Sequence, residues 1–309
     1  MEVGERMRPV SFAIWRGVPL VAVVAVCAAS AQTGSRGIVP EERLRARPQA
    51  TKTPGRPGSA PAMPRYQSVI PGALSRPDSA KQLGVTIWKL RKAAAADAGA
   101  RILVQEDNQT VAWIPERVSS SSALRAGDRV RLTIESPDAG YLYVIERERY
   151  TSGERGAPYL IFPTTRTRDG DNRVMGGRLI DIPAQDDRPN FFSLQSSRQD
   201  QSEEELTVLL TEKPIERLQI GPKALGLPAE QVANWDKQWS SSTAIFELAG
   251  GAGKRWTSAE QRAGAGANRL LTQTDPPPQT IYRVAAGQGE PVLVRVRLRY
   301  QQGTKSAAK

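Results

Sequence analysis

The clearest alternation of apolar and polar positions lies within residues 124–163, where three strands are predicted. Apolar side chains occupy every second position of 129–135, the period of a strand with one buried face. A turn over 137–140 follows. Residues 141–145 are then apolar on both faces, as in a central strand covered on both sides. A charged loop over 146–156 precedes the third strand, so we interpret this stretch as the central hairpin of the core.

Further strands are predicted at similar spacing through the rest of the chain. They lie at 84–92, 101–105, 110–114, 178–182, 190–194, 206–211, 280–285 and 291–300. The second and third of these form a hairpin around an Asp-Asn turn. Strands at this spacing, with no long helix between them, predict an all-β, mainly antiparallel fold. We expect a β-sandwich, immunoglobulin-like or related, with one or two short peripheral helices.

Two short helices interrupt the strand pattern. After Pro228, three apolar residues at helical spacing form one stripe that is expected to dock on the sandwich; they are Val232, Trp235 and Trp239. Thr257 and Glu260 have the spacing of a capping box, which predicts a second short helix. Both helices belong to a single β domain expected over residues 79–301, and 302–309 are expected to form a disordered tail.

Residues 1–31 have the pattern of a signal peptide. Arginines precede a short apolar run at 18–28, and Ala-Ser-Ala at 29–31 has the form of a signal-peptidase site before Gln32. The apolar run is too short to span a bilayer comfortably. The alternatives are a lipoprotein acylated at Cys27 and a retained anchor. Val26 stands where lipoprotein signals usually carry Gly, Ala or Ser. We therefore expect export to the periplasm or the cell surface, with membrane contact only through the leader before cleavage.

Residues 32–78 are rich in Pro, Arg, Ala and Gly, with eight prolines in 47 residues. Such a segment buries too little apolar area to offset the entropy lost on ordering, so a disordered linker is predicted. Its eight basic and three acidic residues suggest either a tether to anionic envelope polymers or a solvated spacer.

Composition excludes much catalytic chemistry. The chain has no histidine, which removes the usual general base and every histidine-containing metal site. Its one cysteine lies in the leader, so a processed chain has no thiol nucleophile or disulfide. The serine run at 119–122 carries no nucleophile motif. The net charge of +11 divides into +6 on residues 1–78 and +5 on the rest, so nucleic acid is not an expected partner.

The candidate binding residues are arginines on two predicted strands: Arg295, Arg297, Arg299, Arg129 and Arg131. If the two strands are neighbours, they form a basic outer face that can hold sulfated, phosphorylated or uronic polymers. The alternative is that these charges keep the strands soluble and discourage edge pairing, with acidic cross-strand partners. The suggested partners are Glu135, Glu146 and Glu148.

Three other features of the sequence suggest sites. The acidic turn at 166–173 has oxygen ligands suited to calcium, but its arginines favour a charged turn instead, and no metal or cofactor is expected. Five tryptophans suggest either a carbohydrate platform or core packing, and their positions on strands and a helix favour the core: Trp88, Trp113, Trp235, Trp239 and Trp256. No motif selects a pair of carboxylates for hydrolysis, and no catalytic residue is assigned.

The order of motifs resembles one bacterial family of unknown function, the domain family numbered 4384. Its progression is matched by Gly-Asp-Arg-Val-Arg-Leu at 127–132, Gly-Tyr-Leu-Tyr-Val at 140–144 and Ile-Phe-Pro at 161–163. The match is clearest over 124–214 and looser over 84–300. The resemblance implies an exported or envelope-associated β domain, and it implies no functional residues.

Together these observations predict a non-enzymatic, exported binding module whose partner is an envelope protein or an anionic polysaccharide. Two alternatives stay open. One is a hydrolase that acts on envelope polymers through carboxylates, which requires a cleft with two carboxyl groups close together. The other is a structural subunit of a surface assembly that uses an unpaired strand edge such as 291–300. The oligomeric state is not predicted.

Overall fold

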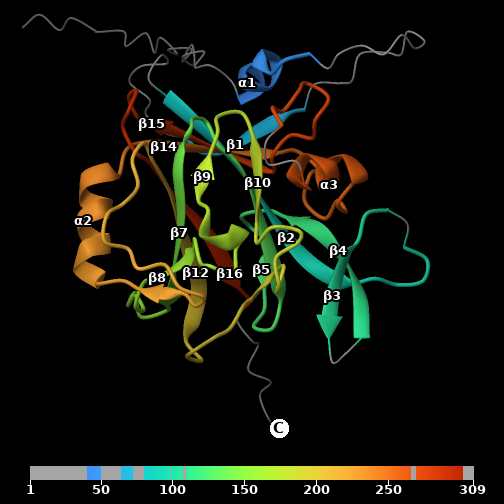
Figure 1. The fold of residues 1–309 in the computed structure, drawn as a ribbon, viewed down its shortest axis with the longest axis horizontal. Helices are drawn as coiled ribbons and strands as arrows, with labels where there is room; N and C mark the ends of the chain where they lie inside the picture. Colours follow the sequence, from blue (N-terminus) through green and yellow to red (C-terminus); the bar gives the residue numbers. More distant parts are fainter. Residues whose placement is uncertain are drawn as a thin grey trace, which may run out of the picture. The chain divides into compact units, whose positions relative to one another are not determined.

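The structure is a computed structural model that describes residues 40–49, 64–71, 80–97, 99–106, 109–265 and 269–301. In these residues the chain forms two packed β-sheets and three short α-helices (Figure 1). All strand pairs are antiparallel except one short parallel pair. The predicted all-β, mainly antiparallel sandwich is confirmed. The predicted leader at 1–31 and the predicted tail at 302–309 lie outside the described residues.

Sheet A has nine strands. They are β1 (Tyr66–Ile70), β2 (Ala80–Lys92), β3 (Ile102–Glu106), β4 (Gln109–Val118), β6 (Arg129–Glu135), β10 (Leu179–Ile182), β11 (Phe192–Ser193), β14 (Thr243–Leu248) and β15 (Thr280–Ala285). The long strand β2 pairs with β15 and β4 along one edge and with β6 along the other. Beyond β15 the sheet continues through β14 to β1.

Sheet B has seven strands. They are β5 (Ala123–Leu124), β7 (Gly140–Tyr150), β8 (Tyr159–Phe162), β9 (Arg173–Val174), β12 (Gln201–Thr211), β13 (Leu225–Gly226) and β16 (Val292–Tyr300). Its order is β13-β8-β7-β12-β16-β5, with β9 beside β7. The two-residue β5 provides the parallel pair, at the end of β16.

Three helices and a 3-10 turn, η2 (Arg168–Gly170), complete the fold. The helices are α1 (Pro40–Ala46), α2 (Ala229–Trp239) and α3 (Ser258–Ala265). The helix α2 docks on the outer face of sheet B, where Val232 packs with Leu209 and Leu293, as its apolar stripe predicts. At the start of α3, the backbone N–H of Thr257 donates to Glu260 Oε2 at 2.6 Å, which confirms the capping box.

The main core fills the space between the sheets. It joins the apolar faces of β2, β6 and β15 in sheet A to those of β7, β12 and β16 in sheet B. The inward residues of β16 are those that alternation predicts: Val292, Val294, Val296 and Leu298. The strand β7 is apolar on both sides because Leu142 and Val144 face this core, while Tyr143 and Ile145 face α2.

Two expectations for residues 124–163 are wrong. The strands β6 and β7 lie in different sheets, so only β7 and β8 form a hairpin, and the stretch as a whole links the two sheets. The link passes close to β12, where a Cβ at position 140 would clash with the carbonyl oxygen of Thr211, so only glycine fits there. The strand β7 also continues to Tyr150, where a loop was expected from residue 146 onward. Pairing with β12 over 201–211 extends it, because the acidic residues of β12 balance its arginines.

Two parts of the predicted disordered linker at 32–78 are structured. Residues 66–70 form β1, which pairs with β14 at the end of sheet A. Helix α1 is held by arginines, because Arg47 Nη2 lies 2.7 Å from Glu135 Oε2 and both side chains are buried. A Pro-rich composition does not reveal such contacts, since their partners lie 88 or more residues away. The other residues of that range are mostly outside the described part.

Candidate functional site

The arginines of β16 lie on the outer face of sheet B, away from the core. Because side chains alternate along a strand, Arg295, Arg297 and Arg299 share the face that the inward valines leave. Helix α2 covers this face near Leu293. Arg297 and Arg299 are exposed and Arg295 is half-buried. The predicted stripe of three arginines is therefore present at the surface.

The acidic partners of this stripe come from β12, and the register explains why they balance it only in part. Glu203 stands opposite Arg299 and Glu205 opposite Arg297. On their other side the same glutamates face Arg149 and Arg147 of β7. Two glutamates thus lie between two columns of arginines, which leaves an excess of positive charge. The suggested partners Glu135, Glu146 and Glu148 do not lie on this face, because the first is in sheet A and the other two point inward.

Distances show which arginines form the closer ion pairs with Glu203 and Glu205. Arg149 lies 3.2 Å from Glu203 Oε1 and 3.0 Å from Glu205 Oε2, whereas Arg297 Nε lies 3.8 and 4.0 Å from the same carboxylates. Arg295 pairs with Asp236 of α2 at 2.8 Å. Within the described part of the chain, the guanidinium group of Arg299 has no hydrogen bond or ion pair. Burial and neighbouring Arg155 also lower the pKa of Arg147. Arg297 and Arg299 are therefore available to bind an anionic ligand on this face.

These three arginines line a groove of about 500 Å³ between β16 and the β1–β14 end of sheet A. Its other walls carry serines, Thr243, and apolar or aromatic side chains. The apolar and aromatic residues are Val69, Ile70, Ile245, Tyr282 and Leu293. Val69 and Ile70 are 45% and 49% exposed. No acidic side chain is among the described residues that line the groove, so the charged side chains among them are all arginines.

The other two candidate arginines are not part of this face. Both lie on β6 in sheet A. Arg129 forms an ion pair with Glu106 and lies over the rings of Trp113 and Phe191. Arg131 is only 2% exposed; it donates to the carbonyl of Pro183 at 2.8 Å and lies 3.5 Å from Asp181. A ligand at the surface of sheet B cannot reach either one.

A second cavity, of about 520 Å³, lies between the sheets and is lined by three carboxylates and several apolar side chains. Glu146 and Glu148 project into it from β7, and Glu204 projects from β12. Burial, with help from the other two carboxylates, raises the pKa of Glu146 to about 8. Burial and Glu148 raise that of Glu204 to about 7, although the Tyr300 hydroxyl, 2.5 Å away, opposes this shift.

Two of these three carboxylates are held by hydrogen bonds from their neighbours. Tyr150 and Ser197 each donate to Glu148 Oε2 at 2.5 Å, and Tyr300 donates to Glu204. The carboxyl group of Glu146 makes no hydrogen bond or ion pair with a described residue. The cluster thus combines the carboxyl group of Glu146, which has a raised pKa and no hydrogen bond, with those of Glu148 and Glu204, which accept hydrogen bonds.

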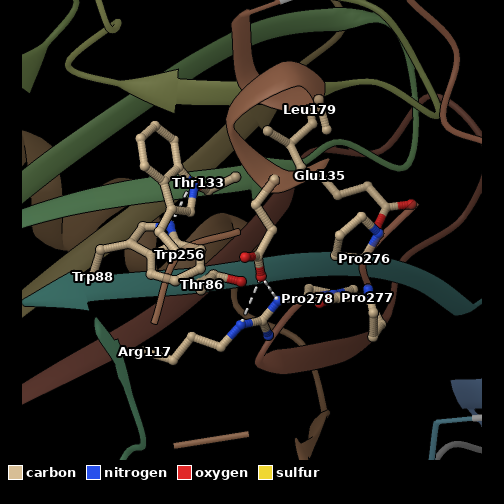
Figure 2. Close-up of a pocket in the computed structure, with 12 residues that line it drawn as sticks. Thr86, Trp88, Arg117, Thr133, Glu135, Leu179, Trp256, Pro276, Pro277 and Pro278 are labelled. Carbon is tan, nitrogen blue, oxygen red and sulfur yellow. Dashed lines mark hydrogen bonds and ion pairs between the residues drawn. The ribbon is translucent and has the colours of Figure 1, made fainter. Parts of the chain in front are cut away.

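A third cavity is small, with about 20 Å³ of free space, which is room for roughly one water molecule. Figure 2 shows Trp88 and Trp256 on one side and the prolines 276–278 on the other. Arg117 Nη2 donates to Glu260 Oε1 at 2.5 Å. Trp88 Nε1 donates to Thr133 Oγ1 at 2.8 Å (Figure 2). These two tryptophans are core residues, 3% and 5% exposed, with no room for a sugar.

The other three tryptophans of the described residues also pack against neighbours. Trp235 and Trp239 stack on each other at 5.8 Å on α2, beside sheet B, and Trp113 lies under Lys92 and Arg129. In the turn at 166–173, Arg168 lies 3.7 Å from Asp171, so its charges pair with each other. Among the described residues, no cluster of three or more His, Cys, Asp or Glu side chains is arranged to hold a metal ion.

Comparisons with known proteins give no match: no family model, curated protein or solved structure resembles this chain significantly. The resemblance to family 4384 therefore stays a prediction. Within the described residues, no helix is long and apolar enough to cross a membrane.

The sequence predicts the arginines of the groove but not its apolar wall. Val69 and Ile70 belong to the range assigned to the linker, and their neighbours in space come from β14 and β16. The one local signal is the run Tyr-Gln-Ser-Val-Ile, in which Tyr, Val and Ile are common in strands. The inward carboxylates were also missed, because charged residues occupy both faces of β7 over 146–149.

Proposed function

We propose that this chain is a non-enzymatic binding module, exported to the cell envelope, whose groove beside β16 holds a partner with a row of anionic groups. One observation carries the proposal: three arginines from a single strand line a groove that contains no acidic side chain among its described residues. The predicted leader supports export, although it lies outside the described residues. The resemblance to an exported β domain agrees with it.

The spacing of the arginines suggests the form of the partner. Alternate residues of a strand lie about 6.6 Å apart, so the three guanidinium groups suit anionic groups that repeat along an extended chain. Carboxylates fit guanidinium groups through paired hydrogen bonds. Both an acidic peptide and a uronic polysaccharide present carboxylates in this way.

We expect removal of the three charges to abolish most of this binding. The variant Arg295→Gln, Arg297→Gln, Arg299→Gln should bind fluorescein-labelled polyglutamate at least about tenfold more weakly, since each exposed contact contributes up to about 1 kcal/mol. Fluorescence anisotropy at low ionic strength measures this, with polygalacturonate as a competitor. Raising the salt concentration should weaken binding by the parent chain.

The matched control removes three exposed arginines elsewhere: Arg166→Gln, Arg173→Gln and Arg188→Gln. Both variants lose three positive charges, so net charge alone predicts equal weakening. Our proposal requires the groove variant to lose binding and the control to keep it. Equal affinities of the two variants would contradict the groove as the site.

A second candidate function is a hydrolase for envelope polymers, and the cavity with three carboxylates is the observation in its favour. Glu146, with a pKa of about 8, would be protonated at neutral pH and could serve as a general acid. If this were the function, Glu146→Gln would abolish polymer hydrolysis while the groove variant would not. We expect instead no hydrolysis by the parent chain in reducing-sugar assays, because hydrogen bonds hold the other two carboxylates.

A further inference from the structure

One backbone edge of β16 lacks a partner strand over most of its length. On one side β16 pairs with β12 over eight residues. On the other side β5 pairs only with Arg299 and Tyr300. Among the described residues, none forms a backbone hydrogen bond with this second edge between Val292 and Leu298. An unpaired edge of this kind is a template for another strand.

The arginine groove lies along this free edge. The backbone N–H of Gln301 donates to the carbonyl of Leu124 on β5 at 2.7 Å, so this N–H points to the edge of β16 that faces β5. The N–H and C=O groups of one residue in a strand point to the same edge, and successive residues alternate between the two edges, so those of Leu293, Arg295 and Arg297 face the same side as the N–H of Gln301. These residues also line the groove. Their backbone donors and acceptors are thus available inside it.

The floor of the groove is suited to the inner face of an added strand. Ile245 of β14 and Tyr282 of β15 stand opposite each other and face the core. Val69 and Ile70 of β1 extend this apolar surface. A strand placed beside β16 would cover these side chains on one face and present its other face beside the arginines.

We propose that the groove binds an extended peptide as an additional strand of sheet B, with acidic residues at alternate positions and apolar residues between them. This inference rests on the proposed function and names its partner as a protein segment. The acidic side chains pair with Arg295, Arg297 and Arg299, the apolar ones cover Ile245, Val69 and Ile70, and the backbone completes the hydrogen bonds of β16.

Charge argues against a second copy of this chain as the occupant. Pairing two β16 edges would place two rows of arginines side by side, and like charges in neighbouring strands are destabilising. A uronic polysaccharide can match the arginines, but it lacks the regular peptide N–H and C=O groups that a strand edge requires. A peptide with alternating acidic and apolar residues can pair with the arginines, cover the apolar floor of the groove and form backbone hydrogen bonds with the free edge of β16.

The test uses the full chain and a labelled peptide with the pattern Gly-Glu-Val-Glu-Val-Glu-Val-Gly. Two derivatives carry backbone N-methyl groups, one on the glutamates and the other on the valines. In an added strand one of these sets of N–H groups faces β16 and the other faces away. We expect one derivative to bind about tenfold or more weakly and the other to retain most of its affinity, as loss of two or more hydrogen bonds implies.

The outcomes separate this inference from the proposed function. Equal affinity of both derivatives, with weaker binding by the arginine variant, would overturn strand addition and leave the anionic groove in place. A second peptide of the same composition has its glutamates grouped at one end. If it binds as tightly as the alternating peptide, strand addition is likewise overturned and the anionic groove stays in place. A dimer of the free chain in light scattering, dissociated by Arg297→Glu, would identify a second copy as the occupant and refute the peptide.

Discussion

Replacing Glu260 by alanine is expected to lower the free energy of unfolding by about 4 kcal/mol, the usual cost of leaving one partner of a buried ion pair without the other. Glu260 Oε1 accepts hydrogen bonds from Arg117 Nε at 3.1 Å and Nη2 at 2.5 Å. Both side chains are buried and line the small third cavity. Arg117 Nη1 already lacks a partner among the described residues, so the loss of Glu260 leaves the guanidinium poorly compensated.

Glu260 has a second role that adds to the loss. Its Oε2 accepts the N–H and the hydroxyl of Thr257 at 2.6 and 2.7 Å, which fixes the first turn of α3. Loss of such a cap typically costs about 1 kcal/mol. Urea unfolding followed by tryptophan fluorescence measures the change, since Trp88 and Trp256 line the same cavity.

Two further variants test the reason for this effect. Glu116→Ala removes an ion pair with Arg91 in which both partners are about one-third exposed, and its cost should stay below about 1 kcal/mol. The double variant Arg117→Met, Glu260→Leu removes both buried charges and should recover most of the stability. If Glu260→Ala costs no more than Glu116→Ala, the buried pair is not what holds this region together.

The strands that sequence reasoning predicts best are those with one apolar and one charged face. In β16 alternation alone fixes both the inward valines and the outward arginines, because a shift by one residue would bury charge. It does not show which strands are neighbours. For that reason Arg129 and Arg131 were grouped with β16, although they pair in sheet A.

Alternation is uninformative where both faces carry charge. Over 146–149 the sequence reads Glu-Arg-Glu-Arg, so the alternation of side chains does not show whether the two glutamates or the two arginines point inward. The register with β12 decides it, since the inward positions continue from Leu142 and Val144. Strand β1 escaped prediction for a related reason: its five residues are stabilised by β14, about 180 positions further along the chain. Long-range pairing of this kind leaves little local signal.

The inward carboxylates should make the free energy of unfolding fall as pH rises from about 4.5 to about 8. The pKa values of Glu146 and Glu204 are raised to about 8 and about 7 in the folded chain, from ordinary values of 4.5. The folded state therefore binds more protons than the unfolded state in this window. Stability is highest below pH 4.5 as far as these groups are concerned, and it declines until both have ionised.

We expect this loss to be on the order of 3 kcal/mol, after allowance for coupling within the cluster and for partial solvent screening. The chain contains no histidine, so no other common side chain titrates near neutral pH with its ordinary pKa. Burial also raises the pKa of Asp181, which contributes in the same direction. Urea unfolding at a series of pH values measures the slope.

The variant Glu146→Gln, Glu204→Gln should match the parent chain at pH 4.5 and exceed its stability at pH 8, because glutamine cannot ionise. Glutamine at position 204 keeps an acceptor for the hydroxyl of Tyr300. Glu154→Gln is the control, because it changes an exposed carboxylate on the surface and should leave the slope intact. A parent chain whose stability rises between pH 5 and pH 8 would contradict the raised pKa values. Buried carboxylates that lower stability near neutral pH are more typical of a functional cluster than of a structural one. A steep fall of the free energy of unfolding between pH 4.5 and pH 8 would therefore favour the hydrolase alternative.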